Sequence, residues 1–547
     1  MVFKKLSHIK IPVSVKLIRK KEFYPVIAIA VIFHLPFWFL PIPTGGDHQS
    51  HAGPAAYALS KLSEYVDICY VRLAGWLIIL LLFLIVFLRY RKRCGPPVYR
   101  ISCRVLTAIT VFALGNAYFF LLNRFNLVGY LGRWETILRY PPLAKVLYLT
   151  GYLLFGVQEF VPRVIQFIFL ILAAMYIIRT LKLFYSSVPE KIIFISFLLF
   201  PTFFHFSNSS LLACGVVFFY AAGSYYFLKA CIFEDETDLV KLSLMLGAGL
   251  LYKRLLLGFF GISIIYLLIY PVRSRNFKRK IIFYYLMAAI CGIPFMIVSG
   301  LTGVRDASLL FPWRDFFINF GQIVLTLGLP ICFIAAAGFF LTLKKKFFRG
   351  DIFFIILFVC YYSMISQTGA NGYIRHAQPF YLSIFYFMVS GLCLLKGAGR
   401  KILFYAVASL FIAGSFYQSV FAKNPFQRKT VYNRFEDVFP YHRLGLYLKT
   451  VQGGPLKIYA PAEGEPSHFY LAKYGLSGRV AWDRRMPEKI TPECVEDYFV
   501  KGGFDYFVFL PILGFQDIED ALLKSSFFTL KKSFEYHGNK IYLLGRR

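Results

Sequence analysis

The chain has few charged residues for its length. Charged side chains make up 16% of its 547 residues, whereas a typical soluble domain has about 25%. Apolar residues make up 58% and aromatic residues 19%. Several apolar runs approach the roughly 20 residues with which a helix crosses a bilayer. This composition excludes one large soluble core and predicts a polytopic α-helical membrane protein.

Acidic residues are especially scarce. The chain has 28 Asp and Glu against 61 Lys and Arg, which gives a formal net charge of +33. On a soluble protein such a charge would suggest a nucleic-acid partner. Here most of the basic residues fall in short loops between apolar runs, as the positive-inside rule expects of cytoplasmic loops. The charge pattern therefore indicates membrane orientation and argues against nucleic acid.

Several familiar motifs are also missing. The ten Cys lie mostly inside apolar segments and form no spaced disulfide or zinc framework. No small-residue cleavage site follows the first apolar run, which starts at Phe23, so we expect an uncleaved first span. The chain has no G-x-G-x-x-G or Walker motif and no internal repeat.

The apolar runs predict about 12–13 spans within residues 1–421. With the basic N-terminus in the cytoplasm, the strongly basic loops all fall on the inner side. Residues 143–155 are short for a span and are expected to form an interfacial helix. The expected spans are 23–41, 71–89, 105–123, 164–182, 191–206, 210–230, 240–252, 256–271, 281–299, 320–342 and 402–421, with two more between 349 and 396.

The composition changes to mixed polar and apolar at Ala422. From there short apolar strands alternate with helix-like stretches, which predicts a small α/β domain over 422–547 on the outer face. The expected strands are 457–460, 480–482, 506–510 and 540–544, and the expected helices are 467–474, 492–501 and 517–524.

Polar residues inside or beside a membrane domain indicate function or a water-filled cavity. The first outer loop contains Asp47, His48 and His51 after a pair of glycines. Asp47 is a candidate base beside the membrane surface. His48 and His51 would share a face of a helix and, with Asp47, could ligate a divalent metal. A solvated polar loop is the alternative.

A second outer segment, 132–148, combines a carboxylate, cations and a Pro-Pro pair. Its candidate residues are Glu135, Arg139, Tyr140 and Lys145. Pro141 and Pro142 give the chain an extended entry into the expected interfacial helix. Arg139 and Lys145 could then face a phosphate at headgroup depth, or simply extend towards the interface.

A third group precedes the span at 164–182. Glu159 and Arg163 lie four residues apart, so they could form a helical ion pair with a structural role. A fourth group consists of outer-side cations that run against the positive-inside bias and need an anionic partner. Its members are Lys253, Arg254, Arg305, Arg314, Arg375 and His376.

These residues, in this order, resemble the GT-C glycosyltransferases, in the branch of the protein O-mannosyltransferases and the lipid A aminoarabinose transferase. RYPPLAK (139–145) is similar to the family's Pro-Pro segment, and FGVQEFVPR (155–163) to the segment that follows it. LLYKR (250–254) and YIRHAQPF (373–380) look like its later Lys and Arg-Tyr segments. Two features depart from the family: Asp47-His48 replaces its usual Asp-Glu, and two expected spans intervene before RYPPLAK.

The resemblance implies sugar transfer from a polyprenyl-phosphate donor to an acceptor on the outer face of a bacterial inner (plasma) membrane. The acceptor would be a glycan, a lipid or a protein, and the displacement would invert the anomeric centre. Asp47 would be the base, with Glu135 as the second candidate. Arg163, with Tyr140 and Glu159, would order the loop. The donor phosphate would be bound by Arg139, Lys145, Lys253, Arg254 and Arg375.

Three other classes remain open. A transporter or flippase of a lipid-linked glycan predicts inverted repeats and interrupted spans. A lipid-linked polymerase or ligase of another fold would concentrate its chemistry in one large outer loop. A non-catalytic scaffold for the C-terminal domain would leave the outer cations unexplained. The sequence does not identify the sugar, the acceptor, the role of the C-terminal domain or the oligomeric state.

Overall fold

The computed structural model divides the chain into two compact units, Met1–Leu40 with Gln166–Asn433, and Pro41–Ile165 with Arg434–Arg547. The second unit therefore groups residues 143–165 with the C-terminal domain. The predicted boundary at 421–422 lies outside the described residues. The structure describes residues 24–39, 143–185, 188–208, 212–272, 274–290, 327–344, 349–367, 378–394, 439–461, 466–483, 489–511, 515–536 and 539–547, with single positions between 52 and 59, 317 and 324, and 402 and 413.

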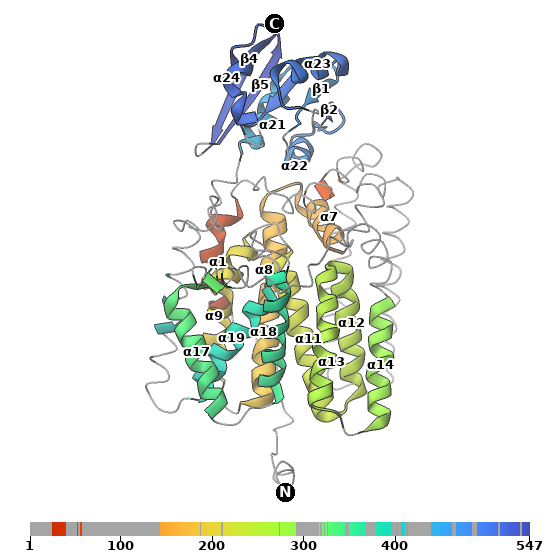
Figure 1. The fold of residues 1–547 in the computed structure, drawn as a ribbon, viewed down its shortest axis with the longest axis vertical. Coiled ribbons are helices and arrows are strands. Elements are labelled where there is room, and N and C mark those ends of the chain that lie inside the picture. The colour runs from red at the N-terminus through yellow and green to blue at the C-terminus, as the bar shows by residue number, and fades with distance from the viewer. Residues whose placement is uncertain are drawn as a thin grey trace. The chain divides into compact units, whose positions relative to one another are not determined.

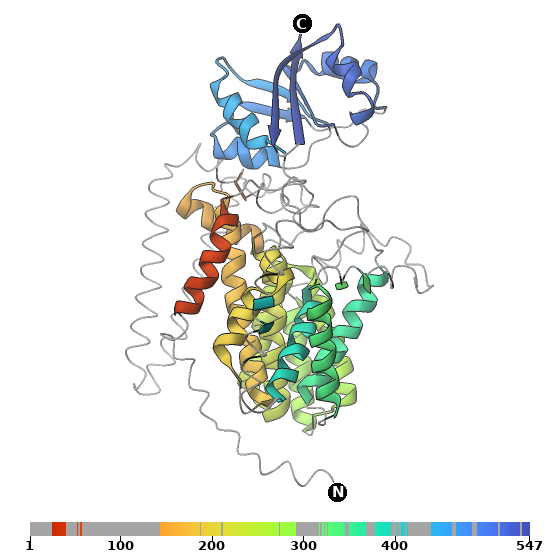
Figure 2. The same cartoon turned by 90° about the vertical axis from the view of Figure 1, so that its left-hand side faces the viewer.

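The first unit is helical throughout its described part. In Figures 1 and 2 α17 and α19 lie side by side, and α12 lies beside α11 and α14. Its elements are α1 (Tyr24–Trp38), most of α8 (Phe160–Phe184), α9 (Glu190–Leu198), α10 (Pro201–Ser207), α11 (Ala213–Phe233), α12 (Glu236–Tyr252), η3 (Arg254–Leu256), α13 (Leu257–Ile269), α14 (Arg275–Ile290), α17 (Leu329–Lys344), α18 (Arg349–Gln367) and α19 (Gln378–Leu394).

Two of the described helices, α8 and α11, are long and apolar enough to cross a membrane. The pair α9 and α10 makes a third candidate if it is one span broken by its 59° bend. Five shorter apolar helices lie at Tyr24–Pro36, Leu143–Phe155, Leu257–Ile269, Leu329–Lys344 and Gln378–Leu394. The expected count of about 12–13 spans stays a prediction, because several of them lie outside the described residues.

The bundle exposes large apolar side chains on its outer surface. Leu268 is 77% exposed, Phe333 70% and Leu244 64%. Such side chains on three different helices are what a lipid-facing surface requires, whereas a soluble monomer rarely exposes so much apolar area.

The acidic loop near Glu234, which is expected on the inner side, leads into α12, and α12 is joined there to α14. Asp235 caps α12 by accepting a hydrogen bond from the Thr237 amide at 2.9 Å, and Glu236 pairs with Lys280 of α14. The structure corrects one boundary. The basic run 271–280 was expected to be a loop, but α14 already begins at Arg275. The pair with Glu236 stabilises that early start.

A second difference concerns the expected single span 191–206. The structure divides it into α9 and α10, bent by 59°. Pro201 begins α10, and Phe200 before it is extended with φ −63° and ψ 129°. A residue that precedes proline is disfavoured in the helical region, so the break follows from the sequence.

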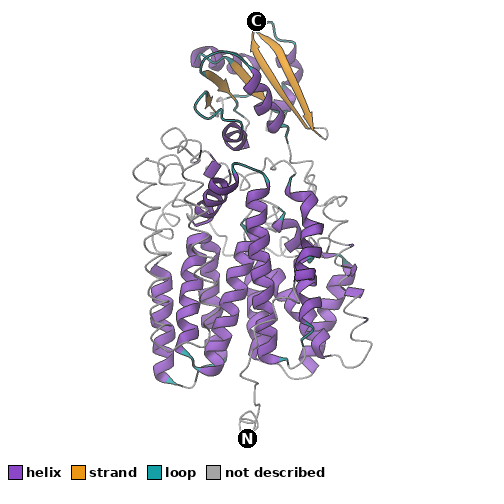
Figure 3. Ribbon diagram, turned by 180° about the vertical axis from the view of Figure 1, so that it is seen from behind, coloured by secondary structure: helices purple, strands orange, loops and turns teal. Residues whose placement is uncertain are grey.

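The second unit contains α7 (Leu143–Phe155), the first turns of α8 and the C-terminal α/β domain. In Figure 3 the strands belong to this domain. Its five-stranded sheet has the order β2-β1-β3-β5-β4, with β1 parallel to β2 and β3, and β5 antiparallel to β3 and β4. The elements are α21 (Tyr441–Thr450), β1 (Leu456–Tyr459), α22 (Pro466–Lys473), β2 (Val480–Asp483), α23 (Pro492–Gly502), β3 (Tyr506–Phe509), η5 (Phe515–Asp517), α24 (Glu519–Leu523), β4 (Phe528–Tyr536) and β5 (Asn539–Arg546).

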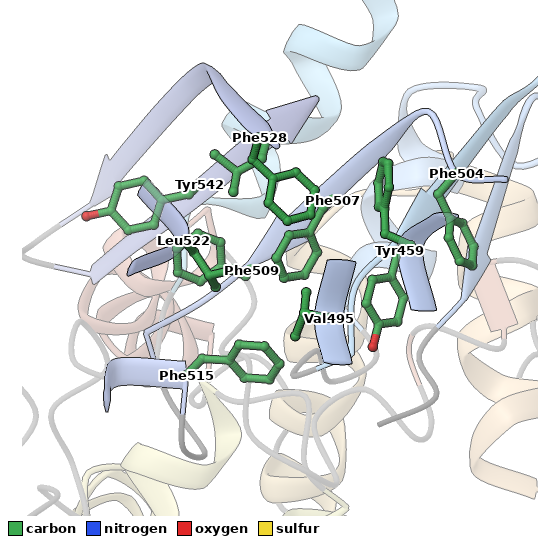
Figure 4. Packing of buried hydrophobic residues seen from close by; sticks show 11 residues of the cluster. Tyr459, Val495, Phe504, Phe507, Phe509, Phe515, Leu522, Phe528 and Tyr542 are labelled. Atoms are coloured by element: carbon green, nitrogen blue, oxygen red, sulfur yellow. The ribbon is translucent and has the colours of Figure 1, made fainter. Parts of the chain in front are cut away.

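The domain has its own apolar core, largely aromatic. Figure 4 shows Phe507, Phe509 and Tyr542 of the sheet packed with Val495 of α23 and Phe515 of η5. Aromatic side chains bury large areas, so a few of them can stabilise a sheet of this size. The predicted α/β domain is confirmed.

Candidate functional site

Helix α7 carries a lysine on its buried face. The helix begins at Leu143, directly after Pro141 and Pro142, and Lys145 in its first turn is only 1% exposed. Tyr148 and Tyr152 continue the same face and are fully buried. Lysine is almost never buried unless its charge is compensated. The structure therefore makes Lys145 a stronger functional candidate than a lysine that reaches towards the interface.

A glycine ends α7 and turns the chain into α8. The Gly156 amide donates to the Tyr152 carbonyl at 2.8 Å, and Gly156 has φ 77°, which a side chain would disfavour. The turn brings Glu159 and Arg163 to the start of α8. This segment is FGVQEFVPR, so its glycine has a backbone role.

Glu159 has a partner that sequence spacing did not reveal. Its two carboxylate oxygens accept hydrogen bonds from Lys473 Nζ of α22, at 2.6 and 2.5 Å. The side chains are only 13% and 20% exposed. Lys473 lies 314 residues along the chain. The C-terminal domain thus contacts the segment between α7 and α8 directly.

Arg163 is among the largest fully buried side chains and is 1% exposed. Its electrostatic neighbours include Tyr470, Glu159, Tyr152 and Tyr536. The expected helical neighbour Glu159 is thus present, and three tyrosines from α7, α22 and β4 join it. Arg163 is placed to hold these elements together, and the loop-ordering role stays a prediction.

The α22 side of this cluster is built from aromatic rings. Phe469 lies 6.1 Å from Tyr152 between ring centroids, and His442 of α21 lies 6.2 Å from Tyr470. Burial lowers the pKa of His442, and the charge of Arg443 lowers it further. The pKa of Tyr474 is raised, first by burial and then by the Glu159 carboxylate.

Lys253 occurs in the helical unit, at a break between two helices. It ends α12 in an extended conformation with φ −157° and ψ 127°, and η3 follows. The side chain of the preceding Tyr252 is buried, and its hydroxyl accepts a hydrogen bond from Gln166 Nε2 at 2.8 Å. Gln166 Oε1 accepts from the Gly215 amide at 3.3 Å. Tyr252, which directly precedes Lys253, is thus held in place by α8 and α11.

The sequence did not predict another buried polar group, which surrounds His34. His34 of α1 is buried, and its Nδ1 lies 3.0 Å from Asn208 Oδ1 and 3.2 Å from Ser207 Oγ. The signal for His34 and Gln166 was available, because each is a polar residue in an apolar run. Lys473 gave no such signal, since lysines are ordinary in a mixed soluble domain.

The described structure brings Lys145, Glu159 and Arg163 together in one unit and places Lys253 in the other. The rest of the predicted site lies outside the described residues or, for Arg254, has an undescribed side chain. The predicted site residues outside the described part are Asp47, His48, His51, Glu135, Arg139, Tyr140 and Arg375. In the part that is described, no group of three or more His, Cys, Asp or Glu could hold a metal. The candidate metal ligands His48 and His51 stay a prediction.

Comparisons with known proteins bear on this arrangement. Residues 139–298 match the family described as dolichyl-phosphate-mannose-protein mannosyltransferase. No curated protein matches the chain in sequence. ArnT from Cupriavidus metallidurans, whose crystal structure has undecaprenyl phosphate bound, is similar in fold with a TM-score of 0.59 and 10% sequence identity. The likeness covers 96% of this chain and 98% of that chain.

The family match begins at Arg139 and contains α7, the Glu159–Arg163 segment and Lys253. The fold match extends over nearly the whole chain, including the C-terminal domain. The chain is therefore an integral membrane protein with the GT-C fold, and residues 139–298 of it are similar to a family of mannosyltransferases.

Proposed function

We propose that the protein transfers a sugar from a polyprenyl-phosphate donor to a glycan, lipid or protein acceptor at the extracytoplasmic face of a bacterial inner membrane. The N-terminus would be cytoplasmic and the C-terminal domain extracytoplasmic. One observation carries the proposal. The buried cation Lys145 lies in the first turn of α7, inside the segment that matches the dolichyl-phosphate-mannose-protein mannosyltransferase family. The structural neighbour ArnT was solved with undecaprenyl phosphate.

The chemistry would be an inverting displacement. Asp47, or Glu135 as the second candidate, takes the proton of the acceptor hydroxyl. That oxygen attacks the anomeric carbon while the bond from this carbon to the phosphate oxygen breaks. The electron pair leaves with the polyprenyl phosphate, whose developing charge is stabilised by cations. The candidate cations are Arg139, Lys145, Lys253, Arg254 and Arg375.

The direct test uses purified protein with an undecaprenyl-phosphate sugar in detergent or vesicles. Asp47→Asn is expected to abolish transfer while the melting temperature stays that of wild type, and Glu135→Gln to retain transfer if Asp47 is the base. Asp497→Asn, a change at a side chain 60% exposed on α23, is the matched control. Full activity in both Asp47→Asn and Glu135→Gln would refute the mechanism.

One observation favours a flippase as the second candidate. The α9–α10 pair, bent by 59°, has the geometry of a broken span or a re-entrant loop, and broken helices are common at transporter binding sites. The two functions separate in proteoliposomes with a fluorescent lipid-linked sugar. A flippase would move the label across the bilayer without transferring it, whereas a transferase would consume the donor and leave the lipid on its side.

A further inference from the structure

Helix α22 of the C-terminal domain presents three side chains to the connection between α7 and α8. Phe469 contacts the Tyr152 ring, Tyr470 interacts with Arg163, and Lys473 binds Glu159. Residue 473 lies four positions after 469 and three after 470, so the three share one helical face. The contact is thus a continuous surface of one helix.

The other side of α22 is fixed to its own domain. A Cβ at Gly445 of α21 would lie 2.7 Å from the Tyr474 ring, so the two helices pack where a side chain would separate them. His442 of α21 bridges this helix to the sheet, with ring centroids 5.4 Å from Tyr536 of β4. Movement of α22 therefore requires movement of the domain.

The face of α7 that α22 covers is the face that holds Lys145. Lys145 and Tyr152 are seven residues apart, two turns of one helix, and both are buried. Phe469 covers the end of this face at Tyr152, and Lys473 fixes the segment that follows it. A tilt of α7 around this contact would displace Lys145.

We propose that Lys473 is a positioning residue of the donor site, and that α22 uses it to hold α7 and the buried Lys145 in place. The inference rests on the proposed glycosyltransferase function and gives the C-terminal domain a role in donor binding. The alternative is that the domain binds the acceptor and leaves the donor site unaffected.

The test compares Lys473→Met, Lys473→Arg and Glu159→Gln with Lys501→Met. The control breaks the Lys501–Asp497 pair of the same domain, whose side chains are 75% and 60% exposed. We expect Lys473→Met to raise the KM for the polyprenyl-phosphate donor about ten- to hundredfold, as misplacement of a binding group does, with little change in the acceptor KM. Lys473→Arg should restore most of the loss, and Lys501→Met should behave as wild type.

The double variant Glu159→Gln/Lys473→Met should be no worse than either single variant, since both single changes break one contact. A rise in the acceptor KM alone, or strictly additive effects of the two changes, would overturn the proposal. So would a donor KM in Lys473→Met equal to that of Lys501→Met.

Hydrogen exchange of residues 155–163 in the full chain provides a readout that is independent of activity. Lys473→Met should speed exchange there, whereas Lys501→Met should leave it unchanged. If wild type transfers no sugar but exchange responds as expected, the proposed function fails and the α22 contact stands. Unchanged exchange in Lys473→Met would refute the contact itself.

Discussion

Lys145 is the residue whose position packing alone does not explain. Its side chain is 1% exposed on a helix whose neighbouring positions are tyrosine and leucine. A methionine would fill a similar volume without the desolvation that a buried charge requires. The proposed donor phosphate would be an anionic ligand for this buried cation.

Lys145→Met should accordingly weaken donor binding without unfolding the protein. A hydrogen bond to a charged group contributes about 1.5–3 kcal/mol, so the donor KM should rise by about ten- to hundredfold. The measurement is a donor titration at saturating acceptor. Lys449→Met, at an exposed position of α21, is the matched control. An unchanged donor KM in Lys145→Met would remove this lysine from the site.

Close packing requires a glycine at position 215, and the neighbouring sequence does not indicate this. A Cβ at this position would overlap the ring of Tyr252, which directly precedes Lys253. We expect Gly215→Ala to destabilise the protein by about 1–3 kcal/mol, as overpacking does, and to raise the donor KM by displacing Lys253.

Gly261→Ala is the matched control, because a Cβ there would have no neighbour within 4 Å. Its melting temperature should stay close to that of wild type. The measurement is thermal unfolding of each variant in the same detergent. Equal melting temperatures for Gly215→Ala and Gly261→Ala would contradict the packing argument.

Among the elements, α7 was the most predictable. The expected range 143–155 is the observed one, because Pro142 precedes the helix and Gly156 ends it. The sequence did not predict helix α21 or strand β4, and each has its own reason. Gly445 lowers the helix propensity of α21 at the position where Tyr474 packs against it. The middle of β4, 530–533, is exposed throughout, so the strand lacks a clear alternating pattern.

Helix α21 also gives the C-terminal domain an expected pH dependence. Burial lowers the pKa of His442, as do Arg443 and Lys473, whereas Glu159 opposes the shift. The folded domain therefore favours the neutral imidazole, while the unfolded chain takes up a proton near its ordinary pKa of about 6.5. This contribution to stability is fully present above about pH 6.5 and is lost as the pH falls below it.

Thermal unfolding followed by tryptophan fluorescence from pH 7.5 to 5.5 tests this pH dependence. The unfolding temperature of wild type should fall over that range, and His442→Phe should flatten the fall because it removes the titrating ring. A slope that is the same in both proteins would show that His442 does not titrate with folding.

For the whole molecule, apolar runs and basic loops were enough to predict a polytopic helical protein with a C-terminal α/β domain. They could not predict the Glu159–Lys473 pair, because 314 residues separate the partners and neither stands out locally. The convergence of Asp47, Lys145, Lys253 and Arg375 on one cavity stays a prediction. Sequence order indicates which residues share a side of the membrane, but only packing decides which of them meet.

The proposed reaction makes a further prediction about its lipid product. Inverting displacement releases polyprenyl phosphate, and this product keeps the phosphate that the candidate cations bind. Undecaprenyl phosphate should therefore inhibit transfer competitively with the donor, whereas undecaprenol, which has no phosphate, should inhibit far less. Because one set of contacts serves both lipids, Lys145→Met and Lys253→Met should raise the inhibition constant and the donor KM by similar factors.

Initial rates at several donor and inhibitor concentrations, measured for wild type and the two variants, give both constants. If the inhibition were noncompetitive and insensitive to both substitutions, the product would occupy a second site and these lysines would not bind the leaving phosphate. A flippase would respond differently again, since undecaprenyl phosphate would slow movement of the labelled lipid and no sugar would be transferred at any concentration.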